Sequence, residues 1–125
     1  MARSLMIVDD SVTMRRIIMR TIRMSGIEFG TTEEAGNGAE ALAKLRAGHI
    51  DVVLCDINMP EMTGSEMLKR LRTELPERAG TMVIMVSTES GQDLIDSIMA
   101  SGANGYITKP FTPEKFAEKL KPLLN

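Results

Sequence analysis

The sequence predicts an α/β domain with a doubly wound, five-stranded parallel sheet and five helices on its two faces. Short apolar runs alternate along the chain with longer segments in which apolar residues recur at helical intervals. Strict alternation of strand and helix requires right-handed crossovers, which place helices on both faces of a parallel sheet. A length of 125 residues fits one domain, spanning residues 1–125.

The strand candidates are short runs of consecutive apolar residues, which are typical of strands buried on both faces. Three strong runs and a weaker fourth are Leu5–Val8, Val52–Cys55, Met82–Val86 and Tyr106–Thr108. Thr31–Ala35 is the poorest candidate, and only the spacing between two helices places a strand there. The expected strand order is 2-1-3-4-5, the flavodoxin-like arrangement.

The helix candidates carry apolar residues three or four positions apart. These series are Met14, Ile18 and Ile22; Leu42 and Leu45; Leu68, Leu71 and Leu75; Leu94, Ile98 and Met99; and Phe116, Leu120 and Leu124. Thr63 stands three residues before Glu66, as in a capping box, and Thr112-Pro113 fits a cap followed by a first helical residue. Asn37-Gly38 predicts the turn into the second helix.

Composition excludes several classes of protein. Apolar residues make up 43% and charged residues 26%, and a net charge of −2 gives no support for a nucleic-acid partner. No apolar stretch reaches the roughly 18 residues of a membrane span, and Asp9-Asp10 interrupts the first run too early for a secretion signal. With Cys55 as the single cysteine, we expect a cytoplasmic protein. Arg15, Arg16, Arg20 and Arg23 form either a solvated helix face or a docking surface.

Polar residues follow four of the predicted strands: Asp9 and Asp10, then Asp56, Ser87 and Lys109. In open α/β sheets ligands bind at the carboxyl ends of the strands, where the strand order reverses, here between the first and third strands. Carboxylates placed together repel one another unless a cation is present. All-oxygen ligation favours Mg²⁺ and disfavours zinc.

The same residues fill the roles that phosphoryl transfer needs. Asp56 can be the nucleophile, Asp9 and Asp10 can hold Mg²⁺, Lys109 can supply a cation, and Ser87 can donate a hydrogen bond. Each residue alone is weak support, because Asp and Ser often form turns or caps after strands. Their convergence in one predicted sheet favours a functional site.

Four motifs in this order resemble the receiver domains of two-component response regulators, most closely those of chemotaxis. They are Val8-Asp9-Asp10-Ser11, Asp56-Ile57-Asn58-Met59-Pro60 with Gly64, Val86-Ser87, and Gly102-Ala103 leading to Lys109-Pro110-Phe111. The resemblance covers essentially the whole chain. It also implies a cis Lys109-Pro110 peptide bond.

For chemistry, the resemblance implies that Asp56 receives a phosphoryl group from the phosphohistidine of a sensor kinase. It implies Mg²⁺ ligation by the Asp10 and Asp56 side chains and the Asn58 main-chain carbonyl, with Asp9 acting through water. Lys109 and Ser87 then contact the phosphoryl group. The protein would be a phosphoacceptor that catalyses its own phosphorylation and dephosphorylation, not an enzyme acting on a separate substrate.

For signalling, the resemblance implies that Ser87 moves toward the phosphate and that Tyr106 then turns inward. Thr88 is bulkier than the residue often found there and could hinder this inward position. Asn58 and Glu89 match positions that tune phosphoryl loss, so we expect fast dephosphorylation. The implied output face comprises Gln92, Ile95, Met99, Tyr106 and Lys119. Ile95 and Met99 form either an apolar contact stripe or part of the core.

Other functions stay open at this point. An aspartate-nucleophile phosphatase would want a second acidic residue two positions after Asp56, where Asn58 stands. A nucleotide-binding module would want a Gly-rich loop after the first strand, where the sequence has Asp9–Val12. Within the receiver family, the expected monomer acts on a protein target, either a flagellar motor switch or a kinase or phosphorelay protein.

Overall fold

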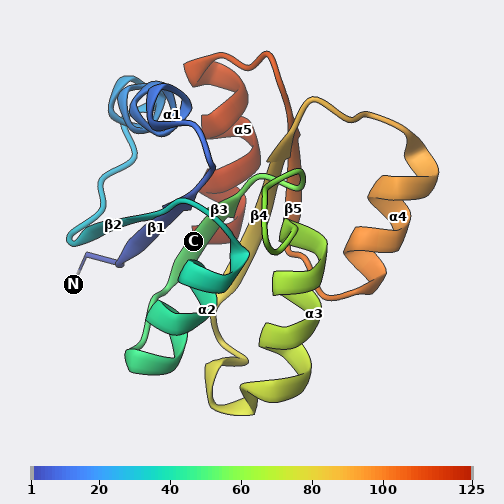
Figure 1. The fold of residues 1–125 in the computed structure, drawn as a ribbon. Helices are drawn as coiled ribbons and strands as arrows, with labels where there is room; N and C mark the ends of the chain where they lie inside the picture. The colour runs from blue at the N-terminus through green and yellow to red at the C-terminus, as the bar shows by residue number, and fades with distance from the viewer. Residues whose placement is uncertain (1, 125) are drawn as a thin grey trace.

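The computed structural model describes residues 2–124, and its five strands form one parallel sheet in the order β2-β1-β3-β4-β5 (Figure 1). In sequence order the strands are β1 (Leu5–Val8), β2 (Thr32–Ala35), β3 (Val52–Cys55), β4 (Met82–Ser87) and β5 (Gly105–Thr108). The predicted fold class and strand order are confirmed. β1 and β3 are buried at every position, which explains their continuous apolar sequence.

The weak sequence signal of β2 follows from its place at the edge of the sheet. It pairs only with β1, and of its four residues only Ala35 is buried. Glu33 and Glu34 are exposed, and charges on an edge strand oppose pairing with another chain. Because β2 lies at the edge of the sheet, it does not have the continuous apolar sequence of a central strand.

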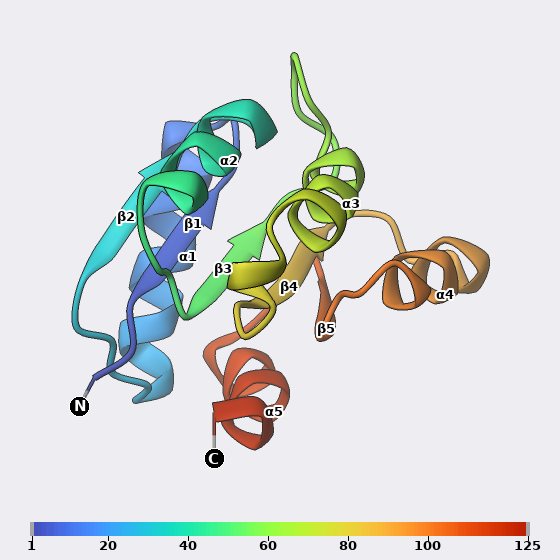
Figure 2. The same ribbon diagram turned by 90° about the horizontal axis from the view of Figure 1, so that it is seen from below.

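Helices cover both faces of the sheet (Figure 2). They are α1 (Val12–Ser25), α2 (Gly38–Ala47), α3 (Gly64–Glu74), α4 (Gln92–Ala100) and α5 (Pro113–Leu124), with a 3-10 turn at Pro76–Arg78. The predicted caps are confirmed, since Thr63 Oγ1 accepts from Glu66 N at 3.2 Å and Thr112 Oγ1 from Lys115 N at 3.1 Å. Across residues 2–124, no helix is long and apolar enough to cross a membrane.

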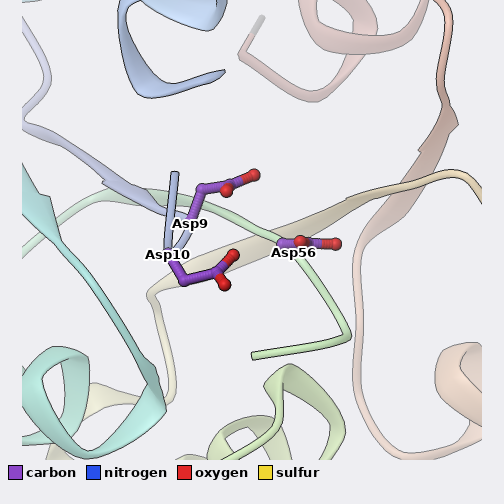
Figure 3. A group of neighbouring side chains, drawn as sticks. All are labelled: Asp9, Asp10 and Asp56. Carbon is purple, nitrogen blue, oxygen red and sulfur yellow. The ribbon is translucent and has the colours of Figure 1, made fainter. Parts of the chain in front are cut away.

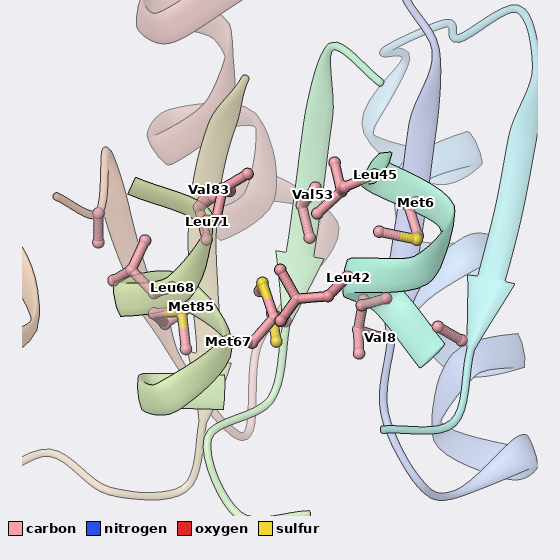
Figure 4. Packing of buried hydrophobic residues seen from close by; sticks show 14 of the residues in the cluster. Met6, Val8, Leu42, Leu45, Val53, Met67, Leu68, Leu71, Val83 and Met85 are labelled. Carbon is pink, nitrogen blue, oxygen red and sulfur yellow. The ribbon is translucent and has the colours of Figure 1, made fainter. Parts of the chain in front are cut away.

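The pleat of β1 divides the core into two clusters. Met6 and Val8 face α2 and α3, whereas Leu5 and Ile7 face α1 and α5. Figure 4 shows the first cluster, in which methionines pack among leucines and valines. Met6, Met67 and Met85 are fully buried and fill this part of the core, whereas Met24 and Met99 are exposed.

A hydrogen-bonded carboxylate ties the N-terminal segment to the start of β3. Asp51 Oδ2 accepts from Ser4 N at 2.8 Å and from Ser4 Oγ at 3.1 Å, while its Oδ1 lies 2.8 Å from His49 Nε2. These contacts, led by the Ser4 backbone bond, hold the pKa of Asp51 below its ordinary value of 3.8. The charged form of Asp51 therefore stabilises the folded state.

Asp51→Asn is expected to reduce the free energy of unfolding at pH 7 by about 1 kcal/mol, because charge-assisted hydrogen bonds at a partly exposed site are lost. Because the folded-state pKa of Asp51 is lowered, the wild-type advantage exists above pH 3.8 and fades as the pH falls through the lowered value. Urea unfolding at pH 7 and near pH 3 measures this gap. Exposed Glu77→Gln is the matched charge removal and should change stability little. A stability difference between wild type and Asp51→Asn that stays constant with pH would contradict the stabilising role of the charged Asp51.

Candidate functional site

Three carboxylates meet at the carboxyl ends of β1 and β3. Asp9 and Asp10 follow β1, and Asp56 follows β3 (Figure 3). The parallel register pairs Val8 with Cys55, so the next residues along each strand come side by side. One carboxylate oxygen from each aspartate lies within 4.8 Å of the others. We call Asp9, Asp10 and Asp56 the acidic pocket.

Lys109 reaches the acidic pocket from the end of β5. Its Nζ donates to Asp9 Oδ2 at 3.2 Å and lies 3.7 Å from Asp56 Oδ2. The Lys109 main-chain N–H donates to Ser87 O at 2.8 Å, which holds the end of β5 beside the end of β4. The Lys109-Pro110 peptide bond is cis, as the resemblance implied. The ends of β1, β3 and β5 thus deliver three carboxylates and a lysine to one place.

Burial and local hydrogen bonds fix the two central carboxylates. Asp9 is 2% exposed, and its Oδ1 accepts from Ser11 N at 2.9 Å. Asp56 Oδ1 accepts from Ile57 N at 2.8 Å. Burial raises the pKa of Asp56, the Lys109 ammonium opposes this rise, and the charge of Asp9 adds to it. The pocket therefore concentrates negative charge in a partly desolvated place.

The donor set of the acidic pocket fits a hard divalent cation. It offers carboxylate oxygens and, among residues 2–124, no histidine joins the cluster. Cys55 is fully buried beside it but is not among the residues whose ligand atoms converge in the cluster. Oxygen ligands of this kind are those that Mg²⁺ prefers.

The loop from β3 to α3, residues 57–63, depends on Gly64. Gly64 N donates to Ile57 O at 2.8 Å, and a Cβ at position 64 would lie only 2.0 Å from Asp56 O. Only glycine lets α3 begin this close to the main chain of Asp56. Asn58, in the same loop, has an exposed side chain. The requirement for glycine at position 64 could not be derived from its sequence neighbours.

Ser87 and Tyr106 are linked through the main chain of Glu89. Ser87 is fully buried at the end of β4, and its Oγ accepts from Glu89 N at 3.2 Å. The Tyr106 hydroxyl donates to Glu89 O at 2.6 Å. Burial is the main cause that raises the pKa of Tyr106. One residue thus connects the strand end near the acidic pocket to the tyrosine of β5.

The expected hindrance of Tyr106 by Thr88 is not found. Tyr106 is only 9% exposed, so its side chain lies inward, and its movement on phosphorylation stays a prediction. Thr88 does not hinder this position, because it is exposed to solvent. The Glu89 carbonyl supplies the hydrogen-bond partner that Tyr106 needs when buried.

The five residues of the expected output face line one groove of about 510 Å³ between α4, β5 and α5. They are Gln92, Ile95, Met99, Tyr106 and Lys119. Ile95 is half-buried and packs on the core, whereas Met99 is 40% exposed. Of the two alternatives for Ile95 and Met99, packing in the core therefore applies to Ile95, and a place on the surface applies to Met99.

Arg15 has a role that sequence reasoning missed. Neither a solvated helix face nor a docking surface describes Arg15, because its side chain is only 15% exposed. Its Nε lies 2.9 Å from Oε1 of Glu34 in β2. Its guanidinium also donates to the main-chain carbonyl of Asp9. Arg16, Arg20 and Arg23 are exposed, as a solvated face requires. The position of Arg15 in the first turn after the paired aspartates is the only sequence signal.

A doubly wound sheet whose strand ends gather three carboxylates and a lysine is the architecture of a receiver domain. A family model described as the response regulator receiver domain matches residues 5–121. The chain belongs to this family.

Chemotaxis proteins are among the relatives of this chain. Chemotaxis protein CheY1 of Helicobacter pylori is 41% identical over 126 residues, covering 96% of this chain and 95% of the relative. Chemotaxis protein CheY of Pseudomonas aeruginosa is 41% identical over 120 residues, covering 95% and 94%. The chain is therefore CheY-like, and CheY-like receiver domains are signalling proteins.

Solved structures agree with this assignment. CheY4 of Vibrio cholerae superposes with a TM-score of 0.82 at 35% identity, covering 99% of this chain and 98% of that one. A CheX–CheY–BeF₃–Mg²⁺ complex from Borrelia burgdorferi gives 0.87 at 26% identity, covering 98% and 90%. As a class, receiver domains bind Mg²⁺ at an acidic pocket and work with a kinase phosphodonor and a downstream target.

Proposed function

We propose that this chain is a chemotaxis switch in which Asp56 accepts a phosphoryl group from the phosphohistidine of a sensor kinase. The observation that carries the proposal is the meeting of three carboxylates with Lys109 Nζ, 3.2 Å from Asp9 Oδ2 and 3.7 Å from Asp56 Oδ2. A nucleophilic carboxylate, a cation ligand set and a fixed ammonium are the parts that phosphoryl transfer needs.

In the proposed reaction an Asp56 carboxylate oxygen forms the new P–O bond as the P–N bond of phosphohistidine breaks. The leaving imidazole keeps the bonding electron pair and takes up a proton. Mg²⁺, held by the Asp10 and Asp56 side chains and the Asn58 carbonyl with Asp9 acting through water, would offset charge on the phosphoryl oxygens. Lys109 neutralises charge at the same oxygens.

Burial suits Asp56 to the role of nucleophile. Desolvation raises the pKa of Asp56, and a poorly hydrated carboxylate sheds less water when it attacks. Lys109 opposes the rise in pKa and favours the ionised, reactive form. A second, separate step removes the phosphoryl group: water attacks the phosphorus, the P–O bond to Asp56 breaks and inorganic phosphate leaves, and Asn58 and Glu89 would tune the rate.

The proposed switch uses the link through Glu89. A phosphoryl group adds about −1.5 to −2 charges and strong hydrogen-bond acceptors, which favour movement of the Ser87 hydroxyl toward it. Such movement would release Glu89 N, which Ser87 Oγ now holds at 3.2 Å. The Tyr106 hydroxyl donates to the Glu89 carbonyl, so a displacement of the Glu89 main chain would also move Tyr106. Because Tyr106 lines the groove between α4 and α5, the change would reach that groove.

The proposed output is contact with a protein at that groove. Gln92 and Met99 from α4, Tyr106 from β5 and Lys119 from α5 offer polar, apolar and positive groups together. We propose a flagellar motor switch protein as the target, supported by the similarity to chemotaxis proteins. A kinase or phosphorelay target is the alternative, and binding of the phosphorylated chain to each candidate distinguishes them.

Incubation with a small acyl phosphate tests the proposed chemistry. We expect intact-mass spectrometry to show one added phosphoryl group in the presence of Mg²⁺ and none in EDTA, because three clustered carboxylates repel an anionic donor without the cation. Asp56→Asn should remove the modification, and exposed Asp93→Asn is the matched control. Phosphoryl transfer to another residue, or uptake that persists in EDTA, would refute the proposal.

A further inference from the structure

The β3–α3 loop is held at its tip by the start of α2. Gly38 N donates to Met62 O at 3.2 Å, and Asn37 Nδ2 donates to Glu61 Oε2 at 3.3 Å. We call Asn37, Gly38, Glu61 and Met62 the loop clasp. These contacts join residues more than twenty positions apart and are separate from the bond that Gly64 makes at the base of the loop.

The clasp holds the loop in a conformation that it would not favour alone. Glu61 has φ 67°, in the left-handed region that a glutamate rarely occupies. Strained residues of this kind persist where the surrounding structure fixes them, and they cluster at functional sites. The hydrogen bond from Asn37 to the Glu61 side chain is one such constraint.

Glycine at position 38 allows α2 to approach the loop tip. A Cβ there would lie 2.9 Å from Met62 O and 3.0 Å from Met62 Cγ. The first of these atoms belongs to the backbone, so an alanine would have to displace the loop itself. By contrast, a Cβ at Gly48, just past the other end of α2, would meet nothing within 4 Å.

The clasped loop carries one proposed cation ligand and begins directly after another. Asn58, whose main-chain carbonyl would bind the cation, stands three residues before Glu61, and Asp56 precedes the loop. Asn37 and Gly38 themselves lie outside the acidic pocket. Any influence on cation binding must therefore pass through the loop.

We propose that Asn37 and Gly38 are positioning residues for the divalent cation, because they fix the loop tip and thereby the Asn58 carbonyl. The inference rests on the proposed function. Groups that orient metal ligands typically change affinity by 10–100-fold when they are removed. We expect the low end of that range, because the clasp acts through three residues of main chain.

Asn37 performs two tasks that a substitution can separate. Its Oδ1 caps α2 by accepting from Glu40 N at 2.8 Å, while its Nδ2 donates to Glu61. Asn37→Asp keeps a capping oxygen but replaces the donor with a carboxylate facing Glu61, which repels it. Glu61→Gln in the same chain restores a neutral partner that can donate. Gly38→Ala tests the close approach, and Gly48→Ala is its control.

Calorimetric titration of the full chain with Mg²⁺ at pH 7 measures the effect. We expect Asn37→Asp and Gly38→Ala to weaken Mg²⁺ binding about tenfold, the double variant Asn37→Asp/Glu61→Gln to recover most of the loss, and Gly48→Ala to bind as wild type. Urea unfolding in EDTA separates positioning from stability. A merely structural clasp would lower the free energy of unfolding in EDTA and leave the Mg²⁺ affinity unchanged.

Wild-type Mg²⁺ affinity in Asn37→Asp, or an equal loss of affinity in Gly48→Ala, overturns the positioning role while leaving the proposed function intact. Failure of the wild-type chain itself to bind Mg²⁺ overturns both. Asn37→Asp tests the positioning role even where Gly38→Ala prevents folding, because the aspartate keeps the helix cap.

Discussion

Replacing Gly64 with alanine is expected to lower the free energy of unfolding by about 3 kcal/mol, at the upper end of ordinary overpacking. The added Cβ would lie 2.0 Å from Asp56 O and 2.8 Å from Met85 Cε. The flexible Met85 side chain can move away, but the carbonyl is part of the main chain of Asp56, which belongs to the acidic pocket. Relief of the clash therefore displaces Asp56, so we also expect Mg²⁺ binding and phosphoryl uptake to fall at least tenfold.

Thermal unfolding measures the first effect of Gly64→Ala, and a loss of 3 kcal/mol corresponds to a fall in Tm of about 10 °C for a domain of this size. Gly80→Ala is the matched control, because a Cβ there meets nothing within 4 Å. A Gly64→Ala chain with the Tm and Mg²⁺ affinity of the wild type would contradict the close packing of α3 against Asp56.

Lys109→Gln is expected to slow phosphorylation by a small acyl phosphate about 100-fold or more, the usual cost of removing one fixed group that stabilises transition-state charge. The same change should strengthen Mg²⁺ binding. Lys109 Nζ lies 3.2 Å from Asp9 Oδ2 and 3.7 Å from Asp56 Oδ2, where it competes with a bound cation for the same negative charge. Opposite effects on rate and affinity distinguish this role from general damage.

Phosphorylation kinetics and calorimetry on the same preparations test Lys109→Gln. Exposed Lys121→Gln removes an equal charge from the far end of α5 and should alter neither quantity. Weaker Mg²⁺ binding in Lys109→Gln would mean that the lysine supports the pocket mainly as structure. An unchanged phosphorylation rate would remove it from the proposed chemistry.

The central fold and the acidic pocket could be predicted because they depend on periodicity and topology. Continuous apolar runs such as Val52–Cys55 indicate buried parallel strands, and parallel strands bring their carboxyl ends to one edge. Asp9, Asp56 and Lys109 are brought together by that rule alone. β2 was hard to predict because an edge strand buries so little; of its residues only Ala35 is buried.

Features that depend on the path of individual side chains could not be predicted. Arg15 turns back to the carbonyl of Asp9, although its neighbour Arg16 is exposed. Thr88 does not hinder the inward position of Tyr106, because its side chain is exposed to solvent, and the hydroxyl of Tyr106 binds a main-chain carbonyl, that of Glu89. The contact of Gly38 with Met62 joins the start of α2 to the β3–α3 loop, and these segments become neighbours only when α2 and α3 pack together.

A crystal structure of the chain with Mg²⁺ and beryllofluoride tests the phosphoacceptor pocket most directly. We expect the beryllium on an Asp56 carboxylate oxygen, a Mg²⁺ ion bound by Asp10, Asp56 and the Asn58 carbonyl, and Lys109 against a fluorine. Beryllofluoride absent from Asp56, or Mg²⁺ bound elsewhere, for example at the exposed Glu33 and Glu34 of β2, would contradict it.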